Sequence, residues 1–148
     1  EDALGAMLVR EAPEADEAAR QAAIRAAQGS PGLARTFVAQ DLGAIHDLMV
    51  RILQNGDRDY ALRGGLSREM GMRPTRDRQL AAIELARAVL LAQLGETAGH
   101  QQLAIIEAYQ SLSQLLVRAP TYNFDAGVLI MEIGGLLASS AMPRERRA

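Results

Sequence analysis

The sequence predicts an all-α protein, and three observations favour that fold class. Apolar residues make up 49% of the 148 residues, whereas aromatic residues make up only 3% and tryptophan is absent. The core must therefore consist of aliphatic side chains, a composition typical of helix bundles. Apolar residues recur at spacings of three and four along most of the chain, and the alternation expected of a half-buried strand persists nowhere.

The first forty residues predict three short helices. Residues 2–11 carry leucine and methionine at helical spacing. Pro13 and the acidic residues that follow it mark the start of a second helix, because negative charge in a first turn is stabilised by the helix dipole. A unit this small has a thin core and would be marginally stable alone.

The second and third helices are joined by the run Gly29-Ser30-Pro31-Gly32. Gly29 suits the left-handed position that follows a helix end. Ser30 can cap the next helix with its hydroxyl, and Pro31 fits the first helical position. Read locally, the run is a helix-to-helix junction.

Five further helices are predicted in the rest of the chain. Asp41 is expected to cap the first of them, Gly64-Gly65 allows a break in the second, and Asn123 or Asp125 is expected to cap the last. The turn signal Asn55-Gly56-Asp57 separates the first two. The expected ranges are 42–52, 58–70, 75–94, 96–118 and 125–140.

The last predicted helix is apolar nearly all round, so we expect it to be surrounded by protein. It is short for a membrane span, and Glu132 interrupts its apolar run. Three interpretations of Glu132 remain open: a buried partner for an arginine, a residue of a groove between subunits, or a position at the rim of the core.

Few residues in the chain suit catalysis or metal binding. Cysteine is absent, which excludes disulfides and thiolate sites. His46 and His100 lie far apart and outside any metal-binding spacing. All sixteen basic residues are arginine and the net charge is −2, so the chain has neither a phosphate-loop lysine nor the charge of a strong nucleic-acid binder. We expect no catalytic, cofactor or metal site.

Residues 26–34 read Ala-Ala-Gln-Gly-Ser-Pro-Gly-Leu-Ala, and a long helical segment follows them. This arrangement resembles the delta-prime subunits of the bacterial DNA polymerase III clamp loader, over essentially the whole chain. The resemblance implies a three-helix AAA+ lid remnant at 1–40 and a helical collar domain, the oligomerisation domain, at 41–148. The step Tyr122-Asn123-Phe124-Asp125 before the final helix is similar to one found in that family.

The resemblance also implies that the chain lacks ATPase function. In subunits that hydrolyse ATP, the lid junction carries an arginine that reaches the nucleotide phosphates. Gly32 stands at that position here, and glycine cannot make the contact. Arg35 lies three residues further on and is not expected to substitute for the missing arginine.

The implied partners are the other clamp-loader subunits in a hetero-pentameric ring in the cytoplasm. DNA and the sliding clamp would be contacted only indirectly, and neither a membrane nor a cofactor is implied. The AAA+ core domain would precede Glu1, which we expect to be an internal residue of a longer protein. The residues expected to provide collar packing or subunit contacts are Ile105, Tyr109, Leu112, Leu116, Leu129, Ile133 and Leu136.

Other functions stay open at this point. A gamma/tau-type clamp-loader subunit is the alternative within the family, although Gly32 argues against it. A helical adaptor or regulator unrelated to replication is the alternative from another class, and a helical-bundle enzyme is disfavoured by the missing ligand cluster. The residues around Asp41 are expected to form a soft hinge between the two parts of the chain. The alternative is that Asp41 only caps a helix within one rigid domain.

Overall fold

A computed structural model describes residues 2–118 and 125–141, and every regular element in this part of the chain is a helix. The all-α prediction is therefore confirmed for the described residues. The helices are α1 (Asp2–Glu11), α2 (Glu17–Ala27), α3 (Pro31–Ala39), α4 (Gly43–Asn55), α5 (Ala61–Met70), α6 (Arg76–Leu94), α7 (Gly99–Arg118) and α8 (Ala126–Ser139).

Side-chain caps fix the starts of several helices, as the sequence predicts. The Ser30 hydroxyl accepts a hydrogen bond from the Leu33 amide at 3.1 Å, and Pro31 is the first residue of α3. The Asp125 carboxylate accepts from the Val128 amide at 3.0 Å and caps α8. Each bond satisfies an amide that has no partner within its own helix.

The prediction that Asp41 caps α4 is wrong. Asp41 has a left-handed backbone with φ of +52°, and Leu42 occupies the cap position without a side-chain hydrogen bond. The amides of Asp41 and Leu42 instead donate to carbonyls of α3, at 3.2 and 3.0 Å. Asp41 therefore terminates α3, because the chain needs a left-handed residue to turn after that helix.

The paired glycines at 64 and 65 do not break α5, which runs unbroken from Ala61 to Met70. Gly65 lies where α5 packs on α4, and a Cβ there would lie 3.2 Å from Leu48 Cδ2. The glycine thus allows the two helices to approach closely. The helix predicted to begin at residue 96 begins instead at Gly99.

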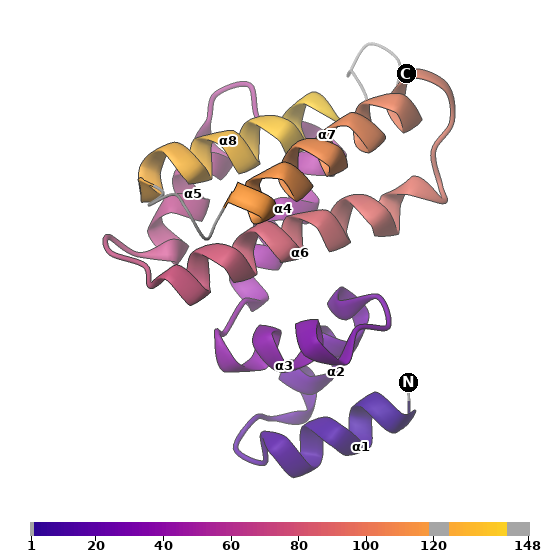
Figure 1. The fold of residues 1–148 in the computed structure, drawn as a ribbon, viewed down its shortest axis with the longest axis vertical. Helices are drawn as coiled ribbons and strands as arrows, with labels where there is room; N and C mark the ends of the chain where they lie inside the picture. The colour runs from indigo at the N-terminus through magenta and orange to yellow at the C-terminus, as the bar shows by residue number, and fades with distance from the viewer. Residues whose placement is uncertain (1, 119–124, 142–148) are drawn as a thin grey trace.

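The helices form two tiers (Figure 1). Helices α1, α2 and α3 lie together in the lower tier, and α4 to α8 form the upper bundle. The long helices α6 and α7 are an antiparallel pair, while α8 packs on α4, α5, α6 and α7. Helices α2 and α3 also pack on α6, so the lower tier is docked on the bundle.

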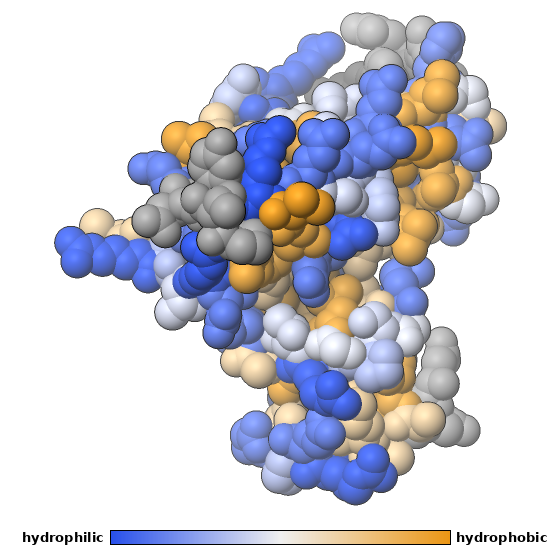
Figure 2. Space-filling model, in the orientation of Figure 1, coloured by the Kyte–Doolittle hydropathy of each residue, from blue (hydrophilic) through white to orange (hydrophobic). Residues whose placement is uncertain are grey.

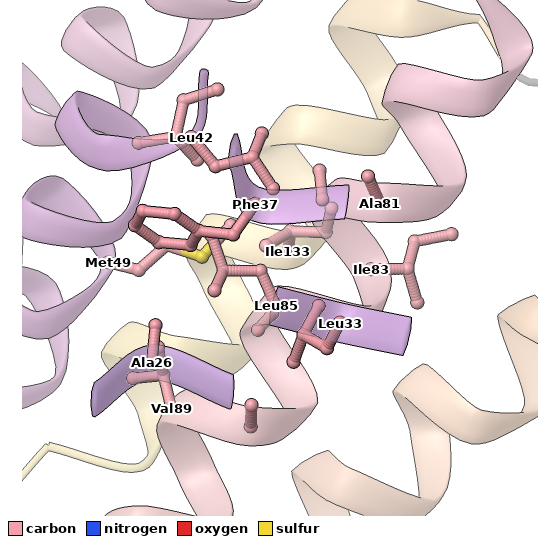
Figure 3. Packing of buried hydrophobic residues seen from close by; sticks show 14 of the residues in the cluster. Ala26, Leu33, Phe37, Leu42, Met49, Ala81, Ile83, Leu85, Val89 and Ile133 are labelled. Carbon is pink, nitrogen blue, oxygen red and sulfur yellow. The ribbon is translucent and has the colours of Figure 1, made fainter. Parts of the chain in front are cut away.

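One apolar core runs through both tiers. Leu8, Phe37, Ile52 and Leu90 are among its buried members, and Ile133 brings α8 into the same cluster. Figure 3 shows Phe37 of α3 beside Met49 and Leu85, where the lower tier meets the bundle. The division into units at residues 1–40 and 41–148, and the softness of their connection, stay predictions.

Candidate functional site

The junction between α2 and α3 is an exposed corner of the lower tier. Gln28 and Gly29 both have left-handed backbones, with φ of +50° and +85°. Ser30 then returns to an extended conformation and caps α3. Two left-handed residues in succession reverse the chain, and glycine adopts the second without steric strain.

Gly32 presents an open position on the first turn of α3. A Cβ placed there would meet only the Ser30 hydroxyl, at 4.0 Å. The side chain of Arg35 does not replace the missing arginine, because its Nε is paired with the Glu11 carboxylate of α1.

The seven residues expected to pack the collar or contact other subunits lie on α7 and α8. Ile105 and Leu112 of α7 are buried, as are Leu129 and Ile133 of α8. The other three, Tyr109, Leu116 and Leu136, are partly buried against the same core. Most of this set therefore packs within the chain and is not available to a partner.

A different set of apolar side chains on α7 and α8 is exposed. Val117 at the end of α7 is 80% exposed, and Val128 near the start of α8 is 65% exposed. We call this set the outer apolar face. Its members are Leu103, Ile106, Val117, Val128 and Met131.

The two helices of the outer apolar face are antiparallel. Ser140, which follows α8, donates from its hydroxyl to the Ala104 carbonyl near the start of α7 at 3.4 Å. The start of α8, with Val128, therefore lies toward the end of α7, with Val117. Figure 2 shows further hydrophobic surface gathered around the turn between α6 and α7.

The outer apolar face corrects the prediction for the last helix, since α8 is not surrounded by protein. A helix that is apolar all round carries no periodic signal to show which side faces the core. Sequence reasoning also missed the exposed side of α7, although Leu103 and Ile106 lie off the stripe of Ile105 and Leu112.

Glu132 is exposed on α8, so its interpretation as a buried partner for an arginine is wrong.

A buried ion pair links α5 to the loop that precedes it, and it was not predicted. Asp57 accepts hydrogen bonds from the Leu62 and Arg63 amides, both at 2.9 Å, and thereby caps α5. The Arg63 Nε lies 3.2 Å from Asp57 Oδ2, and the guanidinium lies 4.0 Å from the centre of the Tyr60 ring. The arginine stem passes over α8 at Gly134, where a Cβ would be only 2.5 Å from Arg63 Cγ.

A hollow of about 840 Å³ lies beside this ion pair, between the loop before α5 and the second half of α8. Its lining mixes acidic and basic groups, including Asp59 and Arg58. The Asp57 carboxylate accepts from two amides in the first turn of α5 and pairs with Arg63, so it holds the preceding loop against the start of that helix. Tyr60, at the edge of the hollow, has a left-handed backbone with φ of +62°.

The two histidines lie in different surroundings. His46 of α4 is half-buried, and its ring meets the Phe37 ring edge-on at a centroid distance of 5.8 Å. Burial lowers the pKa of His46, a shift that Asp47 opposes and Arg25 reinforces. His100 is exposed in the first turn of α7. The structure does not bring the two side chains together into one site.

Among the described residues, no cluster of three or more histidine or carboxylate groups could hold a metal ion. No helix in the same ranges is long and apolar enough to cross a membrane. The predictions for Tyr122, Asn123 and Phe124 lie outside the described residues. Comparisons with protein families, with curated proteins and with solved structures find no match.

Proposed function

We propose that this chain is the assembly region of a delta-prime-type clamp-loader subunit, with an AAA+ lid remnant at 1–40 and a collar domain at 41–148. Its role is to hold its neighbours in a hetero-pentameric ring and so to support loading of the sliding clamp onto DNA. The resemblance of residues 26–34 supplies the family, and Gly32 favours delta-prime over a gamma/tau-type subunit.

The outer apolar face carries the assembly part of the proposal. Monomeric proteins tolerate scattered exposed apolar residues, but clusters of them mark sites of protein–protein contact. Val117 and Val128 lie at neighbouring ends of two long helices, a geometry suited to side-by-side helix packing. Few catalytic groups accompany this face, which favours a role in assembly over chemistry.

Charge introduced on the outer apolar face should prevent assembly without unfolding the chain. We expect Leu103→Glu combined with Val128→Glu to weaken binding to the cognate clamp-loader subunits at least about tenfold, because each carboxylate would lose its water at the interface. The measurement is light scattering after size-exclusion chromatography of mixed subunits.

The matched control is Gln54→Glu on the exposed side of α4, which adds charge away from the outer apolar face. We expect this variant to assemble like the wild type, and all variants to keep the wild-type circular dichroism. If the double variant joined the ring normally, the face would not be the assembly surface. If the wild type bound none of the clamp-loader subunits, the clamp-loader proposal would be wrong. The alternative function, a helical adaptor unrelated to replication, would then take its place.

The chain should not bind ATP. The sequence has no lysine and hence no phosphate loop, and Gly32 offers no positive group to the phosphates. Titration calorimetry with magnesium–ATP should give only the heat of dilution. Binding at micromolar affinity, about −8 kcal/mol, would overturn the assignment of a subunit without ATPase function.

A further inference from the structure

His46 lies where the lower tier is docked on the bundle. Its ring meets Phe37 of α3, and it lines a small cavity of about 260 Å³ between α2, α4 and α6. Ala26 and Val89 line the same cavity, so apolar groups from both tiers surround the ring. His46 is thus the half-buried ionisable group of α4 that faces the helices of the lower tier.

The charges around the ring come from three places. Arg25 of α2 lines the cavity on the side of the lower tier, and Glu96, which follows α6, lines it on the side of the bundle. Asp47 is the neighbour of His46 on α4 itself, and α3 contributes only the uncharged Phe37 ring. A proton on His46 would place a second positive charge near Arg25, in a site where apolar side chains replace much of the water.

We propose that His46 is a pH-sensitive latch: its neutral ring holds α2 and α3 on the bundle, and its protonation loosens that docking. A neutral imidazole packs edge-on against Phe37 at little cost, whereas an imidazolium must either lose its hydration or move out to water. Moving out would separate the ring from Phe37 and open the contact between the tiers. The latch does not depend on the proposed assembly function.

The direction of the pH dependence follows from the burial. The pKa of His46 is lower in the folded chain than in the unfolded chain, where it has the ordinary histidine value. The unfolded chain therefore binds the proton more readily, and protonation favours opening. The stabilisation of the docked tiers by the neutral His46 ring is fully present above the ordinary histidine pKa. It is lost as the pH falls through the lowered pKa that His46 has in the folded chain.

Hydrogen exchange on the whole chain tests the latch. Protection of the amides in α2 and α3 is measured at pH 7.5 and pH 5.0, corrected for intrinsic exchange rates, and compared with protection of the buried amides of α7. We expect a several-fold loss of protection in α2 and α3 at the lower pH, with a much smaller change in α7.

Two variants identify the group responsible. His46→Gln is neutral at both pH values and should abolish the selective loss, and His46→Phe provides a second neutral side chain if glutamine disturbs the packing. His100→Gln, on an exposed histidine, should behave like the wild type. Equal pH dependence in wild type and both His46 variants would overturn the latch, as would a loss of equal size in α7.

Discussion

Replacing Gly134 with alanine is expected to destabilise the fold by about 2 kcal/mol or more. The added Cβ would lie 2.5 Å from Arg63 Cγ and 3.0 Å from Arg63 Cδ. Those atoms belong to the stem of a buried side chain that is paired with Asp57, so the arginine cannot move away without disturbing the ion pair. The free energy of unfolding from urea titration measures the loss.

The neighbouring glycine is a matched control on the same helix. A Cβ at Gly135 would meet no atom within 4 Å. Gly135→Ala should therefore stabilise the fold by up to about 1 kcal/mol, because alanine favours the helix. Similar free energies of unfolding for the two variants would contradict the close crossing of Arg63 over α8.

Replacing Ile133 with alanine is expected to cost about 2–5 kcal/mol. Ile133 is fully buried and faces the core from α8, where it belongs to the cluster that joins both tiers. The loss combines the transfer free energy of the removed methyl groups with the cavity they leave. Thermal and urea unfolding monitored by circular dichroism would give the size of the loss.

Met131 provides the comparison on the exposed side of α8, two residues away. Met131→Ala should change the free energy of unfolding by no more than about 0.5 kcal/mol, as is usual for surface positions. A negligible effect of Ile133→Ala, or equal effects at both positions, would mean that α8 faces the core with a different side.

Local chemistry explains why much of the helical pattern was predictable. The start of α3 depends on the Ser30 hydroxyl and the fixed backbone of Pro31, both adjacent in sequence to the helix they begin. Thr75 caps α6 in the same way, accepting from the Arg78 amide at 3.1 Å. Such signals involve residues three apart, so they can be recognised without knowledge of the fold.

Other features depend on how distant segments meet. Asp41 is a good capping residue by type, but its left-handed backbone completes the end of α3 and removes it from the cap position of α4. Gly65 would weaken an isolated helix, and its close packing beneath Leu48 becomes visible only when α4 and α5 are placed together. In both cases the tertiary arrangement overrides the local preference.

The outer apolar face was the part of the molecule that was least predictable from the sequence. Apolar spacing on α7 indicated Leu112 as a packing residue and placed Leu103 off that stripe, but the second signal was not followed up. The close crossing of Arg63 over α8 was missed because Gly134 lies about seventy residues away in sequence. The sequence pattern cannot reveal a contact between two such distant segments.

Site-specific photo-crosslinking within a reconstituted clamp loader tests the central proposal most directly. A photoreactive residue at Val117 or Val128 should crosslink to a neighbouring subunit, because both positions lie on the outer apolar face. The same residue at Gln54, on the exposed side of α4, should give no crosslink between subunits. Crosslinks from Gln54 but from neither valine, or no incorporation of the chain into the ring, would contradict the proposed assembly.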